Sequence, residues 1–231
     1  MTNEDIFSRI DHTLLKMTAS REEIKTLCDE AVIFKTASVC VPPCYVKQIS
    51  NDYCNQDCYN QDCCDNLNIC TVIGFPLGYS ITAAKVLEAQ RAILSGANEI
   101  DMVINVCDVK NANFDYIMEE IKLVKKACDD KILKVIIETC YLTDEEKIRL
   151  CIIVTEAGAD FIKTSTGFGT AGAVLSDIEL FKKNIGKNVK IKAAGGVKTR
   201  EDIVSFINAG ADRIGTSSGV KILTGENAGS Y

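Results

Sequence analysis

The chain has 231 residues, of which 47% are hydrophobic and 25% are charged, and its formal net charge is −6. This composition is that of an ordinary globular protein, and the negative charge excludes nucleic acid as the main partner. No apolar run approaches the roughly 18 residues of a membrane span, so we expect no membrane partner. The first residues lack the basic and apolar regions of a signal peptide, which predicts a cytoplasmic location.

The chain contains 12 cysteines. A long chain without an export signal favours free thiols in a reducing compartment over disulfides. Four of them, Cys54, Cys58, Cys63 and Cys64, lie in the polar segment 51–66. A metal site there is the alternative to a loop of biased composition, but the spacing lacks the paired C-x-x-C pattern of zinc sites. We therefore predict neither a metal nor another cofactor.

Eight strand-like segments alternate with helix-like segments along the whole chain. The predicted strands are 9–13, 36–41, 69–75, 99–105, 133–139, 160–164, 189–193 and 212–216. Capping boxes predict helix starts at Ser20-x-x-Glu23, Thr143-x-x-Glu146 and Ser176-x-x-Glu179. Parallel strands alternating with amphipathic helices in a chain of this length predict a single-domain (β/α)8 TIM barrel, an α/β fold, over residues 1–231.

A short repeat, Gly-Ala followed by Asn or Asp, begins at residues 96, 158 and 210. Each glycine is expected to end a helix in the left-handed conformation before a strand begins. The residues five positions after these glycines are Asp101, Lys163 and Gly215. Equal offsets on alternate strands place the three at one height inside a barrel. The alternative is a generic helix-to-strand turn, which supports the barrel but no particular chemistry.

Lys163 stands near the end of a predicted buried strand, where a solvated surface charge is not expected. The residues that follow it include Thr166 and Gly167, whose short donors and flexible backbone suit an anion or a carbonyl oxygen. We therefore predict that Lys163 is a Schiff-base nucleophile at the mouth of the barrel.

Lys190 and Lys192 alternate with apolar residues, so both should face the barrel axis, with Lys192 nearer the active-site end. Lowering the pKa of a lysine from about 10.4 to about 7 takes roughly 4 kcal/mol. A second ammonium group about 4 Å away supplies about that much repulsion at an effective dielectric constant of about 20. Asp101 is then a candidate proton shuttle. The alternative is a buried Lys–Asp–Lys network that only fills the barrel.

Two glycine-rich turns follow the last two predicted strands. One contains Gly195 and Gly196, and the other runs from Gly215 through Ser217 and Ser218. TIM barrels often bind phosphate with these two loops, so the turns predict a phosphate site, against the alternative of plain tight turns. Near the start of the chain, Asp11 is a candidate ligand for a substrate hydroxyl and Cys40 a candidate pocket thiol. We expect the single histidine, His12, to make a structural hydrogen bond.

The chain resembles the deoxyribose-phosphate aldolase family. The resemblance lies in residues 10–15 (IDHTLL), 70–78 (CTVIGFPLG), 99–106 (EIDMVINV), 135–143 (VIIETCYLT), 160–168 (DFIKTSTGF), 192–197 (KAAGGV) and 213–218 (RIGTSS). It implies a metal-independent class I aldolase that cleaves 2-deoxy-D-ribose 5-phosphate to D-glyceraldehyde 3-phosphate and acetaldehyde, in deoxynucleoside catabolism. The substrate is thus a sugar phosphate, and a homodimer is expected.

The resemblance also implies roles for individual residues. Lys163 would form the imine, Lys192 would lower its pKa, and Asp101 would transfer protons. The phosphate site would contain Gly195, Gly196, Ser217 and Ser218. The C-terminal Tyr231 would reach into the site. Two features depart from the family, namely Ala194, where many relatives have serine, and the segment 51–66. Two other functions stay open at this point: a transaldolase-like enzyme, and a catalytically inactive barrel that binds a sugar phosphate.

Overall fold

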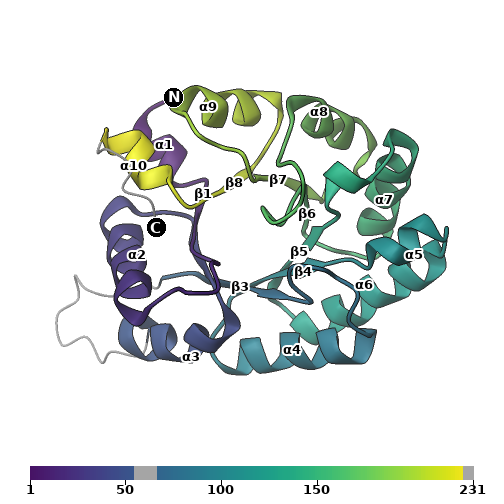
Figure 1. The fold of residues 1–231 in the computed structure, drawn as a ribbon, viewed down its shortest axis with the longest axis horizontal. Coiled ribbons are helices and arrows are strands. Elements are labelled where there is room, and N and C mark those ends of the chain that lie inside the picture. Colours follow the sequence, from purple (N-terminus) through teal and green to yellow (C-terminus); the bar gives the residue numbers. More distant parts are fainter. Residues whose placement is uncertain (55–66, 226–231) are drawn as a thin grey trace.

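Eight parallel strands close into a barrel in chain order, with β8 pairing with β1 (Figure 1). The computed structural model describes residues 1–54 and 67–225. The strands are β1 (Ile10–Thr13), β2 (Ser38–Val41), β3 (Ile69–Ile73), β4 (Glu99–Val103), β5 (Ile132–Ile136), β6 (Phe161–Lys163), β7 (Lys190–Ala194) and β8 (Arg213–Thr216). The predicted TIM barrel is confirmed.

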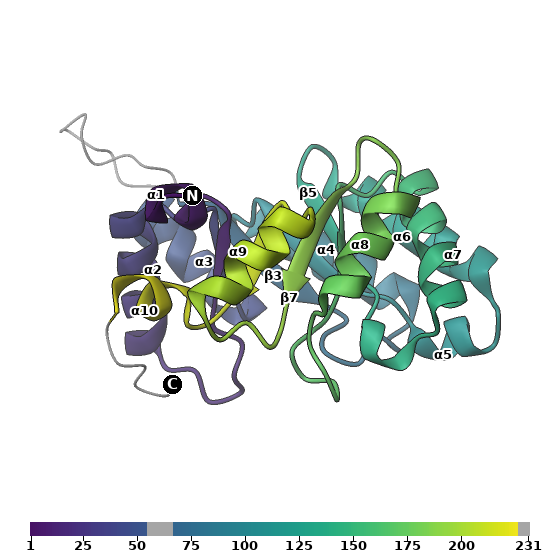
Figure 2. The same cartoon turned by 90° about the horizontal axis from the view of Figure 1, so that it is seen from above.

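Helices form a ring outside the strands and run alongside them (Figures 1 and 2). The helices are α1 (Asn3–Phe7), α2 (Arg21–Phe34), α3 (Val46–Ile49), α4 (Thr82–Leu94), α5 (Val106–Lys110), α6 (Phe114–Cys128), α7 (Asp144–Glu156), α8 (Leu175–Asn184), α9 (Arg200–Ala209) and α10 (Gly219–Thr224). Short irregular helical turns lie at η1 (Pro43–Tyr45), η2 (Ser50–Cys54) and η3 (Thr139–Tyr141). Within residues 1–54 and 67–225, no helix has the length and apolar character needed to cross a bilayer.

The strands present different chemistry on their two faces. Side chains such as Val39, Ile100 and Ile162 point outward and pack with the helices in one large apolar core. A small separate apolar cluster, formed by Cys40, Cys70 and Val72, lies on the inward side. The inward positions also hold buried charged side chains, among them Asp101, Lys134 and Lys192.

The repeat behaves as predicted. Gly96, Gly158 and Gly210 all have positive φ angles, between 78° and 124°, where each chain segment leaves a helix and enters a strand. Asp101 and Lys163 also lie at one height, as predicted, because their side chains form a hydrogen bond inside the barrel.

Some predicted boundaries were wrong. The capping boxes at Ser20 and Thr143 are present, but α8 begins at Leu175 after Val174, and Ser176 lies inside its first turn without capping it. The predicted strand 133–139 is too long, since β5 ends at Ile136 and Glu138 has a left-handed backbone with φ 55°. The prediction for the cysteine-rich segment 51–66 concerns mainly residues 55–66, and these lie outside the described residues. The prediction for Tyr231 also lies outside them, because residues 226–231 are not described.

Candidate active site

The carboxylate of Asp101 is the centre of a charged network inside the barrel. Its Oδ2 accepts hydrogen bonds from the Nζ atoms of Lys163 and Lys192, each at 2.7 Å. Its Oδ1 accepts from Lys134 Nζ at 2.9 Å. The four side chains come from β4, β5, β6 and β7, and all of them are at most 3% exposed. Three lysine Nζ atoms therefore converge on one buried carboxylate.

A second layer of charge lies below this centre. Lys192 Nζ is 2.5 Å from Asp11 Oδ2, and Lys134 Nζ is 2.5 Å from Glu99 Oε2. The guanidinium group of Arg213 donates to both Asp11 and Glu99. Gly215 leaves room for this arrangement, because a Cβ atom there would lie 3.1 Å from Lys192 Cε. Each carboxylate of the interior thus contacts at least two cations.

These contacts fix the charges of most members of the network. Burial opposes ionisation, yet the ammonium groups of Lys134, Lys163 and Lys192 hold the pKa of Asp101 well below its usual value. Burial also disfavours the charged form of Lys192, but Asp101 and Asp11 outweigh it and raise the pKa of Lys192. The pKa values of Lys134 and Arg213 are raised by neighbouring carboxylates against the same opposing effect of burial.

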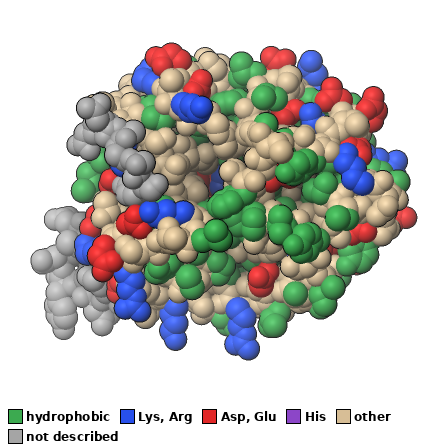
Figure 3. Space-filling model, viewed as in Figure 1, with side chains coloured by type: hydrophobic (Ala, Val, Ile, Leu, Met, Phe, Trp, Pro, Cys, Tyr) green, Lys and Arg blue, Asp and Glu red, His purple; other side chains and the backbone are tan. Residues whose placement is uncertain are grey.

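A pocket of about 540 Å³ opens above the network at the carboxyl ends of the strands. Of the four interior cations, Lys134, Lys163, Lys192 and Arg213, only Lys163 lines it. The other lining residues are Thr13, Leu14, Leu15, Lys16, Met17, Thr18, Thr166, Gly167, Phe168, Ala194, Gly195, Gly196, Val197, Gly215, Thr216 and Ser217. In Figure 3 a hollow lies at the centre of the molecule, with hydrophobic side chains gathered on one side of it.

The glycine turns of the pocket carry free donors. Gly195 and Gly196 both have positive φ angles, 81° and 76°. Their amide groups, and that of Ser217, have no acceptor within residues 1–54 and 67–225. Successive amides of this kind form concave anion sites. The predicted phosphate turns therefore meet in one pocket with Lys163.

Three residues that were predicted to bind the substrate, Asp11, Cys40 and Ser218, lie outside the pocket lining. Asp11 is fully buried, and its oxygens contact Lys192, Arg213 and Ser38, so its position does not favour contact with substrate. Ser218 directs its amide and hydroxyl groups to the hydroxyl of Thr216.

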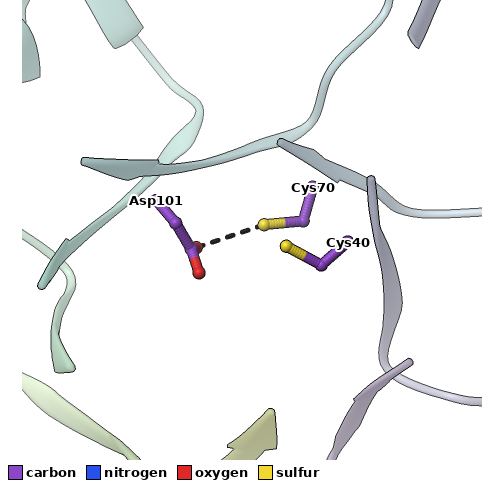
Figure 4. Close-up of side chains that lie close together, drawn as sticks. All are labelled: Cys40, Cys70 and Asp101. Carbon is purple, nitrogen blue, oxygen red and sulfur yellow. Dashed lines mark hydrogen bonds between the residues drawn. The ribbon is translucent and has the colours of Figure 1, made fainter. Parts of the chain in front are cut away.

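Cys40 is fully buried on β2, where it pairs in register with Cys70 of β3 (Figure 4). The thiol of Cys70 donates to Asp101 Oδ1 at 3.1 Å. Two sulfur atoms and a carboxylate this close resemble a metal-ligand set. However, Asp101 already accepts hydrogen bonds from three lysine Nζ atoms, and Lys134 Nζ donates to the Cys70 sulfur at 3.3 Å. A metal ion would have to displace these cations, so the arrangement favours the charge network.

Two other predictions concern His12 and Lys190. The Nε2 atom of His12 lies 2.6 Å from Glu30 Oε2, which is the structural hydrogen bond expected for it. Lys190 lies at the opposite end of the barrel, is exposed, and places its Nζ 5.8 Å from the ring centroid of Phe161.

The sequence interpretation missed Lys134, Glu99 and Arg213. A signal for each was present, because Glu99 and Arg213 stand two residues before Asp101 and Gly215, and Lys134 is flanked by the apolar residues Leu133 and Val135. Strand alternation places all three inside the barrel.

Comparison with known proteins agrees with this geometry. The family profile described as "DeoC/LacD family aldolase" matches residues 7–225. The chain belongs to the DeoC/LacD aldolase family. A deoxyribose-phosphate aldolase of Clostridium botulinum (strain Alaska E43 / Type E3) is 57% identical over 231 residues, covering 100% of both chains. One of Clostridioides difficile (strain 630) is 58% identical over 226 residues, covering 98% of this chain and 99% of the relative.

A solved structure of this family has the same fold. The deoxyribose phosphate aldolase of Aeropyrum pernix, described as tetrameric, superposes with a TM-score of 0.85 at 33% identity, covering 96% of this chain and 91% of the other. The resemblance to the family is therefore confirmed over the full barrel, and the chain is an aldolase.

Proposed function

We propose that this aldolase cleaves 2-deoxy-D-ribose 5-phosphate to D-glyceraldehyde 3-phosphate and acetaldehyde through an imine on Lys163. The observation that carries the proposal is the position of Lys163, the interior cation that both contacts the carboxylate of Asp101 and lines the pocket. Relatives sharing more than half of the sequence are named deoxyribose-phosphate aldolases.

The charge balance of the barrel supports Lys163 as the free amine. The interior carboxylates are Asp11, Glu99 and Asp101, and the interior cations other than Lys163 are Lys134, Lys192 and Arg213. These six groups balance one another, so the interior is neutral when Lys163 is an amine and carries one excess positive charge when it is an ammonium group. Excess charge is costly in a buried site. The network therefore favours the nucleophilic form of Lys163.

The proposed reaction follows from this arrangement. The amine of Lys163 adds to the aldehyde carbon C1, and uptake of a proton with loss of water gives the protonated imine. A base removes the proton of the C3 hydroxyl, the C2–C3 bond breaks, and its electron pair passes into an enamine. D-Glyceraldehyde 3-phosphate leaves, C2 takes up a proton, and water hydrolyses the imine to release acetaldehyde. Asp101 and Lys192, which share a hydrogen bond beside Lys163, are the proposed proton carriers.

The phosphate group of the substrate is proposed to bind the free amides of Gly195, Gly196 and Ser217. These residues line the same pocket as Lys163, and the two glycines carry no side chain that would shield their amides from an anion. Tyr231 remains a proposed contributor to proton transfer in the acetaldehyde half of the reaction.

The test is product analysis with two donor substrates. Wild-type protein should release D-glyceraldehyde 3-phosphate from 2-deoxy-D-ribose 5-phosphate, and Lys163→Ala should not. Lys190→Ala is the matched control, since it removes an exposed lysine of the same barrel. Cleavage of longer ketose phosphates in place of the deoxy sugar would support a transaldolase-like enzyme instead. Binding without turnover of either substrate would support an inactive sugar-phosphate receptor.

We also propose that the protein self-associates, works in the cytoplasm and needs no metal. The relative from Aeropyrum pernix is described as tetrameric, and the notable number of free thiols, nine within the described residues, suits a reducing compartment. Sedimentation at micromolar concentration should show a dimer or a tetramer, and a monomer would refute self-association. Activity should survive treatment with a chelator.

A further inference from the structure

Glu138 is a buried carboxylate beside the pocket to which the proposed reaction gives no role. It follows β5, is 4% exposed, and has the left-handed backbone angles φ 55° and ψ 67°. Residues other than glycine, asparagine and aspartate rarely adopt this conformation. Such an outlier persists only where the surrounding structure holds it, and outliers of this kind cluster at functional sites, so its contacts indicate where to look for a function.

The carboxylate of Glu138 binds the backbone and side chain of a single residue, Thr166. The Thr166 amide donates to Oε1 at 3.1 Å and to Oε2 at 3.3 Å, and its hydroxyl donates to Oε2. The Thr166 hydroxyl in turn accepts from the amide of Phe168 at 3.0 Å. One carboxylate therefore fixes the turn 166–168, with Gly167 at its centre in a positive φ of 87°.

This turn forms a wall of the proposed phosphate site. A Cβ atom on Gly195 would lie 3.6 Å from Gly167 Cα, so the two glycines are neighbours. The Gly167 amide has no acceptor among the residues that the structure describes, and Gly167 lines the same pocket as Gly195 and Gly196. The far end of the loop is also fixed, because the Ala173 amide donates to the carbonyl groups of Ala194 and Gly195.

Glu138 does not line the pocket itself. Its carboxylate is covered by the same loop, since a Cβ atom on Gly169 would lie 3.2 Å from Glu138 Cδ. Any effect on the substrate must therefore pass through Thr166 and Gly167.

We propose that Glu138 is a positioning residue for phosphate recognition, which holds the turn 166–168 so that the Gly167 amide joins Gly195 and Gly196 in binding the substrate phosphate. The inference rests on the proposed function for the identity of the substrate. It assigns Glu138 no contact with the reacting carbon atoms.

The experiment compares Glu138→Gln with Glu120→Gln on two substrates, 2-deoxy-D-ribose 5-phosphate and unphosphorylated 2-deoxy-D-ribose. Glutamine keeps the length of the side chain but removes its negative charge, and an NH2 donor replaces one of the two oxygens that accept hydrogen bonds from Thr166. Loss of one charge-assisted hydrogen bond should raise KM for the phosphorylated sugar about tenfold, with kcat little changed. The kcat/KM for 2-deoxy-D-ribose should stay within about twofold of wild type. Glu120 is a matched control, because it is equally buried but pairs with Lys85 outside the barrel.

An equal loss on both sugars would overturn the inference, because it would show that Glu138 supports the reaction centre or the fold in general. If Glu138→Gln does not fold, Thr166→Val, which removes the hydroxyl bound by Glu138, must show the same phosphate-specific loss.

Calorimetric titration with inorganic phosphate separates this inference from the proposed function. If wild-type protein binds phosphate but does not cleave the deoxy sugar, the proposed function fails, and a weaker phosphate affinity of Glu138→Gln still supports the inference. Unchanged affinity would refute it.

Discussion

Replacing Lys192 by methionine tests the charge balance inside the barrel. The variant loses the ammonium group between Asp101 and Asp11, so the three interior carboxylates face only Lys134 and Arg213. A protonated Lys163 then restores neutrality, and the amine needed for imine formation becomes scarce at neutral pH.

The magnitude follows from the geometry. The Nζ atoms of Lys163 and Lys192 both lie 2.7 Å from Asp101 Oδ2. They are therefore at most about 5 Å apart, and at an effective dielectric constant of about 20 their repulsion is about 3 kcal/mol. Its loss should move the ascending limb of the kcat/KM–pH profile about two pH units to higher pH.

The assay is the rate of 2-deoxy-D-ribose 5-phosphate cleavage between pH 5.5 and pH 10 (about the range in which a lysine amine is titrated). Lys190→Met is the control, because Lys190 lies two residues earlier on the same strand and is exposed; its profile should match wild type. The plateau value of kcat/KM at high pH is a separate quantity, because Lys192 is also a proposed proton carrier. An ascending limb at the same pH in Lys192→Met and in wild type would contradict the charge balance, whatever happens to the plateau.

Two further predictions concern stability. Lys134→Met should lower the free energy of unfolding by roughly 3–5 kcal/mol, because it leaves the buried carboxylates of Glu99 and Asp101 short of a partner; urea unfolding measures this, and a loss under about 1 kcal/mol would contradict it. Burial raises the pKa of three thiols to about 12, those of Cys28, Cys128 and Cys151. The unfolded chain ionises them near pH 9 while the folded chain does not, so this contribution to stability is full below pH 9 and is lost between pH 9 and 12 at about 1.4 kcal/mol per pH unit for each thiol. Urea unfolding measured at pH 9 and at pH 10 gives the fall in the free energy of unfolding per pH unit. This fall should be smaller by about that amount in Cys28→Ala than in wild type, and an equal fall in both proteins would count against the prediction.

The fold and the core of the site could be predicted because they rest on periodic features. Alternation of strand residues placed Lys192 inside the barrel, and the glycine repeat placed Asp101 and Lys163 at one height. The same alternation applied to Glu99, Lys134 and Arg213 gives the second layer of the network.

Other features depend on contacts that no local pattern encodes. Glu138 has a left-handed backbone, and its carboxylate binds Thr166, a residue 28 positions away, so the strand ends earlier than alternation along the sequence predicts. The burial of Asp11 beneath Lys192 likewise depends on how the closed barrel sets strand heights, so a residue predicted to bind substrate lies below the pocket.

The central claim is that Lys163 is the amine that forms the imine. It is tested most directly by reducing the protein with borohydride in the presence of 2-deoxy-D-ribose 5-phosphate and mapping the adduct by peptide mass spectrometry. We expect a single reduced adduct on Lys163, absent when substrate or borohydride is omitted. An adduct on Lys134 or Lys192, or full turnover without any trapped lysine, would contradict it.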